Sequence, residues 1–141
     1  MHSAQFSLCL AVVLLGALSC NALTWESCNE SNAAIKLSKV EMTPDPPTAN
    51  SLVKIRILGT SGAEVADGDV SVKISWAGMQ VAQQTLSLCK FLSCPIKAGP
   101  ITATYENTMP SFVPRGKYGV DVVARSGSGS DVLCMRASFN V

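Results

Sequence analysis

Strict alternation of apolar and polar residues is the feature of this chain that most limits its fold. In the run 52–58, Val53, Ile55 and Ile57 fall on one face, while a lysine and an arginine fall on the other. Similar or less regular apolar spacing marks the runs 35–42, 70–76, 79–88, 101–106, 118–124 and 133–141. A period of two with polar outer positions is typical of half-buried antiparallel strands.

Turn signals separate these runs. Pro, Gly, Asp and Ser, which favour tight turns, cluster at residues 44–47, 59–62, 67–69, 114–116 and 126–130. The serine–glycine run 126–130 is short and predicts a hairpin turn, not a linker between domains. No window has the periodicity of an amphipathic helix, so the chain is predicted to be an all-β sandwich of about seven antiparallel strands.

The N-terminus has the layout of a secretory signal peptide. Phe6–Leu18 is apolar and uncharged, but it is shorter than the about 20 residues that span a bilayer. Small residues follow at 17–22, as expected near a cleavage site. We therefore predict a signal peptide at 1–22 and one domain at 23–141, the alternative for the apolar segment being a buried helix of that domain.

Cysteine parity bears on the cleavage site. The chain has 6 cysteines. Cleavage after Ser19 would leave an odd number of them in the mature protein, and cleavage after Ala22 would leave an even number. An even number suits a secreted protein with disulfides, and favours Ala22. The four that remain allow three pairings. Proximity favours Cys89 with Cys94, which leaves Cys28 with Cys134; a zinc site is the competing interpretation.

Composition and residue types exclude several functions. Lys plus Arg is 11 and Asp plus Glu is 10, a balance that argues against nucleic-acid binding. The single histidine, His2, lies in the predicted signal peptide, so the mature chain cannot form a histidine-dependent catalytic triad. The carboxylates fall mainly in turns or on outward faces, and no phosphate-binding loop is present. We expect no enzyme activity, no metal and no cofactor.

Apolar residues remain the main candidates for function. The inward strand positions are mostly Val, Ile, Leu and Ala, and they could form a packed core or line a cavity. Two apolar pairs also lie in turn-like segments: Phe91 and Leu92 between two cysteines, and Phe112 and Val113 between two prolines. Exposed apolar residues on loops cost free energy unless they cover something. These pairs could plug the ends of the sandwich or border a cavity.

The order of landmarks resembles the ML lipid-recognition family. Cys28 is followed by T-P-D-P at 43–46, V-S-V-K-I-S-W at 70–76, L-C-x4-C-P-I at 88–96, and a last strand bearing Cys134. An M-P segment and P-x-G-x-Y stand between the last two. The resemblance covers about residues 28–141. It is closest to the branch that holds the Niemann-Pick type C sterol carrier and the phosphatidylglycerol/phosphatidylinositol transfer proteins.

The resemblance implies an immunoglobulin-like sandwich whose sheets splay to hold a lipid. It implies the disulfides Cys28–Cys134 and Cys89–Cys94, no catalytic residues, and binding and transfer of a sterol or phospholipid. Some sterol carriers have a third disulfide after the first strand, where this chain has residues 43–46 without cysteine. This two-disulfide pattern is more similar to plant- or fungal-type members. The alternative function is a secreted interaction module with a solid core.

The site residues follow from the inward strand faces and the resemblance together. The cavity walls are predicted to be Ile55, Ile57, Val72, Ile74, Trp76, Tyr105, Tyr118, Val120 and Val122. The predicted entrance is Phe112 with Val113, and Phe91 with Leu92 is the second candidate. We expect a monomer that touches membranes transiently and works outside the cell or in an endolysosomal or vacuolar lumen. Asn29, in the sequon Asn29–Ser31, is a candidate glycosylation site.

Overall fold

A computed structural model of the chain describes residues 23–141. The predicted signal peptide, with Cys9 and Cys20, lies outside the described residues. All seven predicted strands are present, and a short strand that the pattern did not predict precedes them. The described elements are β1 (Thr24–Ser27), β2 (Ile35–Thr43), β3 (Leu52–Ser61), β4 (Gly68–Trp76), β5 (Met79–Ser87), the 3-10 turn η1 (Leu88–Lys90), β6 (Gly99–Thr108), β7 (Lys117–Ser126) and β8 (Asp131–Asn140).

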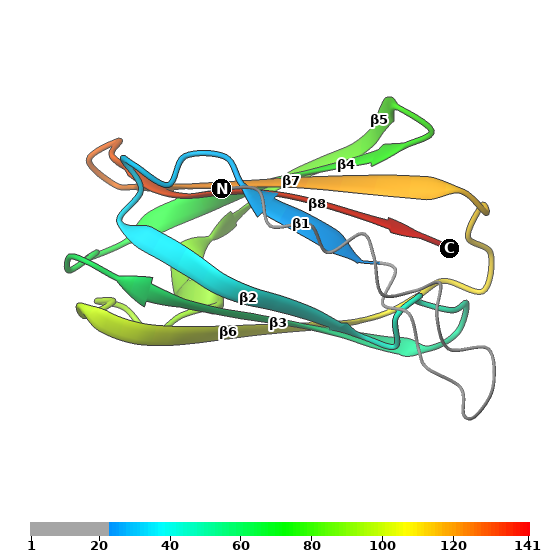
Figure 1. Cartoon of the computed structure of the whole chain (residues 1–141), viewed down its shortest axis with the longest axis horizontal. Coiled ribbons are helices and arrows are strands. Elements are labelled where there is room, and N and C mark those ends of the chain that lie inside the picture. Colours follow the sequence, from blue (N-terminus) through cyan, green and yellow to red (C-terminus); the bar gives the residue numbers. More distant parts are fainter. Residues whose placement is uncertain (1–22) are drawn as a thin grey trace, which may run out of the picture.

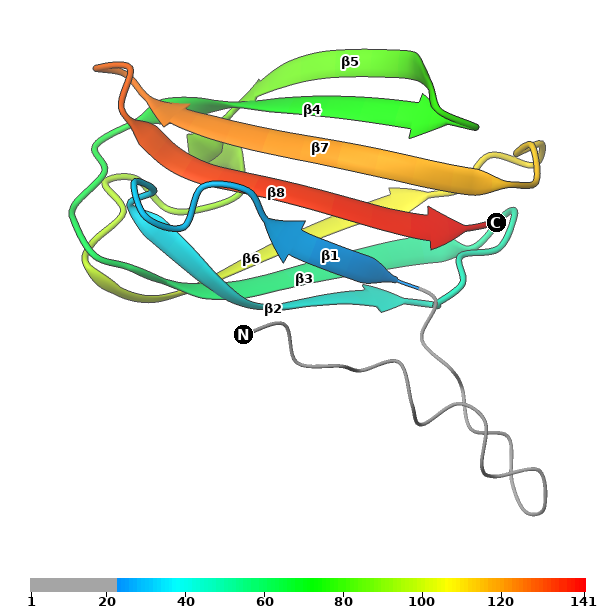
Figure 2. The ribbon, with the colours of Figure 1, turned by 45° about the horizontal axis from the view of Figure 1, so that its top comes forward.

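The strands form two antiparallel sheets that face each other (Figure 1). One sheet has five strands in the order β1-β8-β7-β4-β5, and the other has three in the order β2-β3-β6. Figure 2 shows β2, β3 and β6 as a layer beneath the larger sheet. The predicted all-β sandwich is therefore confirmed.

A packed core occupies one end of the sandwich, which we call the closed end. The loops 28–34, 62–67, 88–98 and 127–130 meet there. Ala124 is fully buried and Val132 is 1% exposed. They pack with the other buried members of one cluster, which are Ile35, Val65, Val70, Leu88 and Ile96. This end has the dense interior expected of an ordinary β-sandwich.

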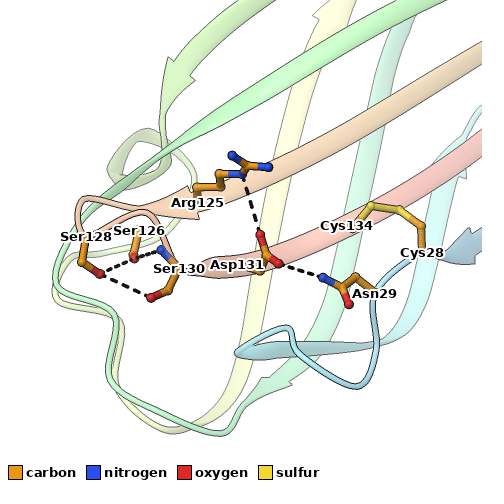
Figure 3. Close-up of polar contacts among 8 residues, drawn as sticks. All are labelled: Cys28, Asn29, Arg125, Ser126, Ser128, Ser130, Asp131 and Cys134. Atoms are coloured by element: carbon orange, nitrogen blue, oxygen red, sulfur yellow. Dashed lines mark hydrogen bonds and ion pairs between the residues drawn. A yellow bond between two sulfur atoms is a disulfide. The ribbon is translucent and has the colours of Figure 1, made fainter.

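The serine–glycine segment forms the β7–β8 hairpin at the closed end, as the turn signals predict. Ser126 Oγ accepts a hydrogen bond from the Ser130 backbone N–H at 3.1 Å and lies 2.9 Å from Ser128 Oγ (Figure 3). These short side chains satisfy turn groups locally, which stabilises the hairpin.

Asp131 ties this hairpin to the loop between β1 and β2 (Figure 3). Its carboxylate accepts a hydrogen bond from Asn29 Nδ2 at 2.9 Å and lies 3.7 Å from Arg125 Nε. Next to Asn29, Cys28 is bonded to Cys134, with their Cα atoms 5.1 Å apart. The start of the described chain is thus fastened to its last strand.

Candidate functional site

The pairing of strands establishes which side chains point between the sheets. Alternate residues of a strand point to opposite faces, and residues directly opposite on neighbouring strands share a face. Val53 of β3 and Val70 of β4 are buried, so the positions two and four residues beyond them face inward as well. We call the inward-facing side chains of both sheets the inner surface.

All nine predicted wall residues lie on this inner surface. Ile55 and Ile57 share a face with buried Val53 in β3. Tyr105 pairs directly with Ile55, and therefore faces the same way. The other six come from two neighbouring strands of the larger sheet and pair across it: Val72 with Val122, Ile74 with Val120, and Trp76 with Tyr118.

Burial of the inner surface falls off along the smaller sheet. In one cross-strand row, Met42 is 8% exposed, Ile55 is half-buried and Tyr105 is 40% exposed. In the larger sheet, Met135 is buried, Val122 and Val72 are half-buried, and Gln84 of β5 is exposed. Both sheets therefore leave their inward side chains accessible toward β5 and β6. A fully packed core would bury them.

The inner surface also lacks charge. Within residues 23–141, every Lys, Arg, Asp and Glu of a strand stands at an outward position of the alternation. Several of these outward residues pair on the outer faces: Lys39 Nζ lies 2.7 Å from Glu41 Oε1, and Lys54 Nζ lies 3.4 Å from Glu106 Oε1. Water can therefore reach apolar side chains without any ionic group among them.

Two depressions on the outer faces have a different character. One, of about 300 Å³, is lined by Glu41, Thr43, Lys54, Arg56 and Thr104 of the smaller sheet. The other, of about 180 Å³, lies beside the Cys28–Cys134 bond on the larger sheet. Hydrogen bonding to Lys39 and its positive charge hold the pKa of the Glu41 carboxyl below its usual value. Both depressions are lined by charged residues, so neither provides the predicted lipid cavity.

Aromatic side chains gather where the inner surface reaches the other end of the sandwich, which we call the open end. The loops 44–51, 77–78 and 109–116 meet there. Trp76, Tyr118 and Phe139 stand in one cross-strand row on β4, β7 and β8. The rings of Tyr118 and Phe139 stack, with centroids 5.7 Å apart and planes 9° apart.

Two of these aromatic residues also brace the loop 109–116. Tyr118 Oη donates a hydrogen bond to the Pro114 carbonyl at 2.9 Å, and Trp76 Nε1 donates one to the Arg115 carbonyl at 3.2 Å. Gly116 has a φ of +139°, and a Cβ there would lie 3.0 Å from Trp76 Nε1. This glycine therefore serves both the turn and the close approach of the indole.

The other side of the loop is anchored to the β2–β3 connection. The Met109 N–H donates to the Ser51 carbonyl at 2.9 Å, and the Met109 carbonyl accepts from the Asn50 N–H at 3.2 Å. Between the two anchors, the Phe112 side chain is 83% exposed and Val113 is half-buried. Phe112 is therefore presented to solvent by a loop held at both ends, and it does not plug the sandwich.

The second predicted entrance pair lies elsewhere. Phe91 and Leu92 are half-buried, pack against the core cluster of the closed end, and belong to the loop that the Cys89–Cys94 bond closes. The Phe91 ring lies 6.0 Å from the Tyr105 ring, centroid to centroid. The structure therefore brings Phe91 next to one predicted wall residue and places Phe112 at the open end.

Sequence reasoning omitted several residues of the inner surface. Met42 and Phe139 belong to runs whose alternation was recognised, so their faces could have been read from the pattern. Trp25 lies in the four-residue strand β1, and it pairs with Ala137 on the inward side of β8. A strand this short offers too few alternating positions to be detected from sequence.

Other kinds of site can be checked in the same part of the chain. Among residues 23–141, no group of three or more His, Cys, Asp or Glu side chains is placed to hold a metal ion. The described cysteines are all in disulfides. No helix in the described region is both long and apolar enough to cross a bilayer.

Comparison with known proteins adds a family and a fold. A family model described as the ML domain matches residues 22–141. A phosphatidylglycerol/phosphatidylinositol transfer protein of Mycosarcoma maydis is 29% identical over 82% of this chain. The match covers 64% of that relative, so the chain spans less than two thirds of its length. A protein of the same name from Emericella nidulans is 29% identical over 79% of this chain and 70% of its own.

Two solved structures have the same fold. A Niemann-Pick type C2 protein from the Japanese carpenter ant matches with a TM-score of 0.66 and 15% identity, covering 83% of this chain and 98% of that one. Chicken MD-1, solved in complex with lipid IVa, matches with a TM-score of 0.63 and 15% identity, covering 84% of this chain and 88% of that one.

Proposed function

This chain belongs to the ML domain family, and we propose on that basis that it binds a sterol or phospholipid between its two sheets and transfers it between membranes. The observation that carries the proposal is the inner surface: mainly apolar, free of charge within residues 23–141, and left accessible toward β5 and β6. The names of the transfer-protein relatives support transfer as the activity.

The energetics of transfer fit such a surface. A lipid tail that leaves a bilayer costs about 0.8 kcal/mol for each CH2 group exposed to water. Apolar walls such as Ile57, Ile74 and Val120 would keep that tail dry during transfer. A buried charge among them would have to be desolvated, and its absence removes that cost. The proposed process involves no covalent step, and therefore no catalytic residue.

Organic extraction of the purified protein, followed by mass spectrometry, tests the proposal. We expect a sterol or phospholipid to be recovered in an amount close to one per protein. As a control, the extraction is repeated on protein stripped of lipid and reloaded with vesicles. If neither the purified nor the reloaded protein carries lipid, the chain is an interaction module with a solid core instead.

We propose that Phe112 and Val113 form the entrance and touch the membrane during exchange. Phe112→Ala should slow lipid transfer between vesicles while changing the free energy of unfolding by no more than about 0.5 kcal/mol, as for other exposed positions. The exposure of this side chain supports the expectation. Transfer is measured by a fluorescent-lipid assay and stability by urea unfolding.

Phe139→Ala is the matched control for this prediction. Phe139 is half-buried and stacks on Tyr118, so its truncation should cost about 1–2 kcal/mol, less than for a fully buried aromatic residue but more than for an exposed position. A Phe112→Ala protein that loses as much stability as this control, with normal transfer by its folded fraction, would contradict the entrance assignment.

The proposed location is outside the cell or in an endolysosomal or vacuolar lumen. The disulfides Cys28–Cys134 and Cys89–Cys94 suit an oxidising compartment. Asn29 remains a predicted glycosylation site. Its amide nitrogen, to which a glycan would be attached, donates to Asp131 in the folded chain. Attachment would therefore have to replace this hydrogen bond.

A further inference from the structure

The two sheets have four edge strands, and three of them carry features that oppose pairing with another chain. In the described part of the molecule these edges are β1, β5, β2 and β6. β1 has only four residues. β2 carries Lys36 and Lys39 and a register shift, and β6 carries Pro100 and Glu106. Short length, charge, irregular register and proline are the usual protections of a sheet edge.

The edge of β5 carries almost none of these protections. Its sequence, MQVAQQTLS, has no charged residue, no proline and no glycine. Seven of its nine residues are exposed, including Met79 at 63% and Val81 at 55%. The register shift against β4 falls near its start, and the ladder is regular from Ala82 to Ser87. Figure 2 shows β5 as the outermost strand of the larger sheet.

We propose that β5 pairs antiparallel with β5 of a second copy of this chain. When a strand pairs with itself about a two-fold axis, the residue on the axis faces its own copy, so a charge at that position would meet a like charge. β5 avoids this repulsion because it is uncharged, whereas β2 does not. In a register centred on the middle of the strand, Gln83 faces Gln83. The five-stranded sheets of the two copies then form one continuous sheet of ten strands.

The pairing also gives the inward side chains of β5 new neighbours along the sheet. Ala82 and Gln84 share a face with Ile74 and Val72, and both are exposed in the single chain. In the dimer, the inner surfaces of the two copies become neighbours across the paired strands. A single strand pair buries less than the about 1,200–2,000 Å² of a standard stable interface. The dimer is therefore weak and forms with rising concentration, and it differs from the monomer that the sequence predicts.

Sedimentation of the wild-type protein across the micromolar range tests this inference. We expect its average mass to rise from one protomer toward two. Gln83→Lys and Gln83→Glu should each remain monomeric, because like charges then meet at the axis. An equal mixture of the two variants should associate again, because opposite charges meet there.

Two features of the design separate this effect from damage to the strand. Gln83 pairs with Lys73 of β4, which repels a lysine and attracts a glutamate. If the substitutions acted by disturbing the strand within one copy, Gln83→Lys would therefore lose more stability than Gln83→Glu. If they act at the dimer axis, both variants lose dimerisation alike. Thr60→Lys, an exposed position on the central strand β3, should dimerise like the wild type. A wild-type protein that stays monomeric throughout, or variants that dimerise separately, would overturn the inference. Neither outcome bears on whether one copy carries lipid.

Discussion

Removing the Cys28–Cys134 disulfide is expected to lower the free energy of unfolding by about 4–5 kcal/mol, according to the loop-entropy relation. The two cysteines are 106 residues apart, so their bond restricts nearly the whole unfolded domain. In the folded chain Cys28 is exposed, so the double variant Cys28→Ser/Cys134→Ser leaves no cavity in the core. Most of the loss should therefore come from the greater freedom of the unfolded chain.

The second disulfide provides the matched control. Cys89 and Cys94 are separated by 5 residues, and loss of their bond should cost about 2 kcal/mol by the same relation. Urea unfolding of the two double-serine variants, each compared with the wild type, measures both values. If the variant lacking the short link is the less stable of the two, chain entropy is not the main contribution of these bonds.

The Cys28–Cys134 disulfide also holds the short strand β1 in place in the folded chain. The Cys28 N–H donates to the Cys134 carbonyl at 3.1 Å, and β1 pairs with β8 just before this point. β1 is only four residues long and forms an edge of the sheet. Such a strand makes few hydrogen bonds of its own. The covalent link therefore keeps β1, and with it Trp25, on the inner surface.

The fold could be predicted largely from the sequence because most strands have one polar face. In β4 the alternation is strict, and in β3 and β7 it is regular enough to have identified the strands and their inward residues. β1 was missed because four residues hold too little pattern. The packed closed end was also not predicted, because the inward residues of both ends are Val, Ile and Leu. The periodicity of a strand shows which face of the sheet a side chain is on, but not how far apart the two sheets lie.

Loop residues were the least predictable part of the candidate site. Phe91 and Phe112 have similar settings in the sequence, each in an apolar pair between turn-forming or bonded residues. The structure separates them: Phe91 packs near Tyr105, whereas Phe112 is 83% exposed. The difference arises from hydrogen bonds between distant segments, such as that from Trp76 to the Arg115 carbonyl. Local sequence carries no signal for such contacts.

A charge placed on the inner surface should abolish lipid transfer without unfolding the protein. Ile57 and Leu58 are neighbours on β3, both half-buried and of equal size, but they point to opposite faces of the smaller sheet. Ile57→Glu puts a carboxylate against the proposed lipid tail, where an uncompensated charge costs several kcal/mol. An estimate of about 3 kcal/mol corresponds to a loss of about 100-fold in lipid affinity.

Leu58→Glu is the control that decides the interpretation, because it introduces the same charge on the outer face of the same strand. It should keep lipid binding and transfer near the wild-type level. Binding is measured by extraction and mass spectrometry and transfer by the vesicle assay, each normalised to the folded fraction from circular dichroism. Equal loss of lipid in both variants would mean that the substitutions act through stability. Retention of lipid by folded Ile57→Glu would show that the lipid does not lie between the sheets. Ile57 and Leu58 differ in little except the face of the sheet to which they belong, so only the position of the new charge separates the two variants.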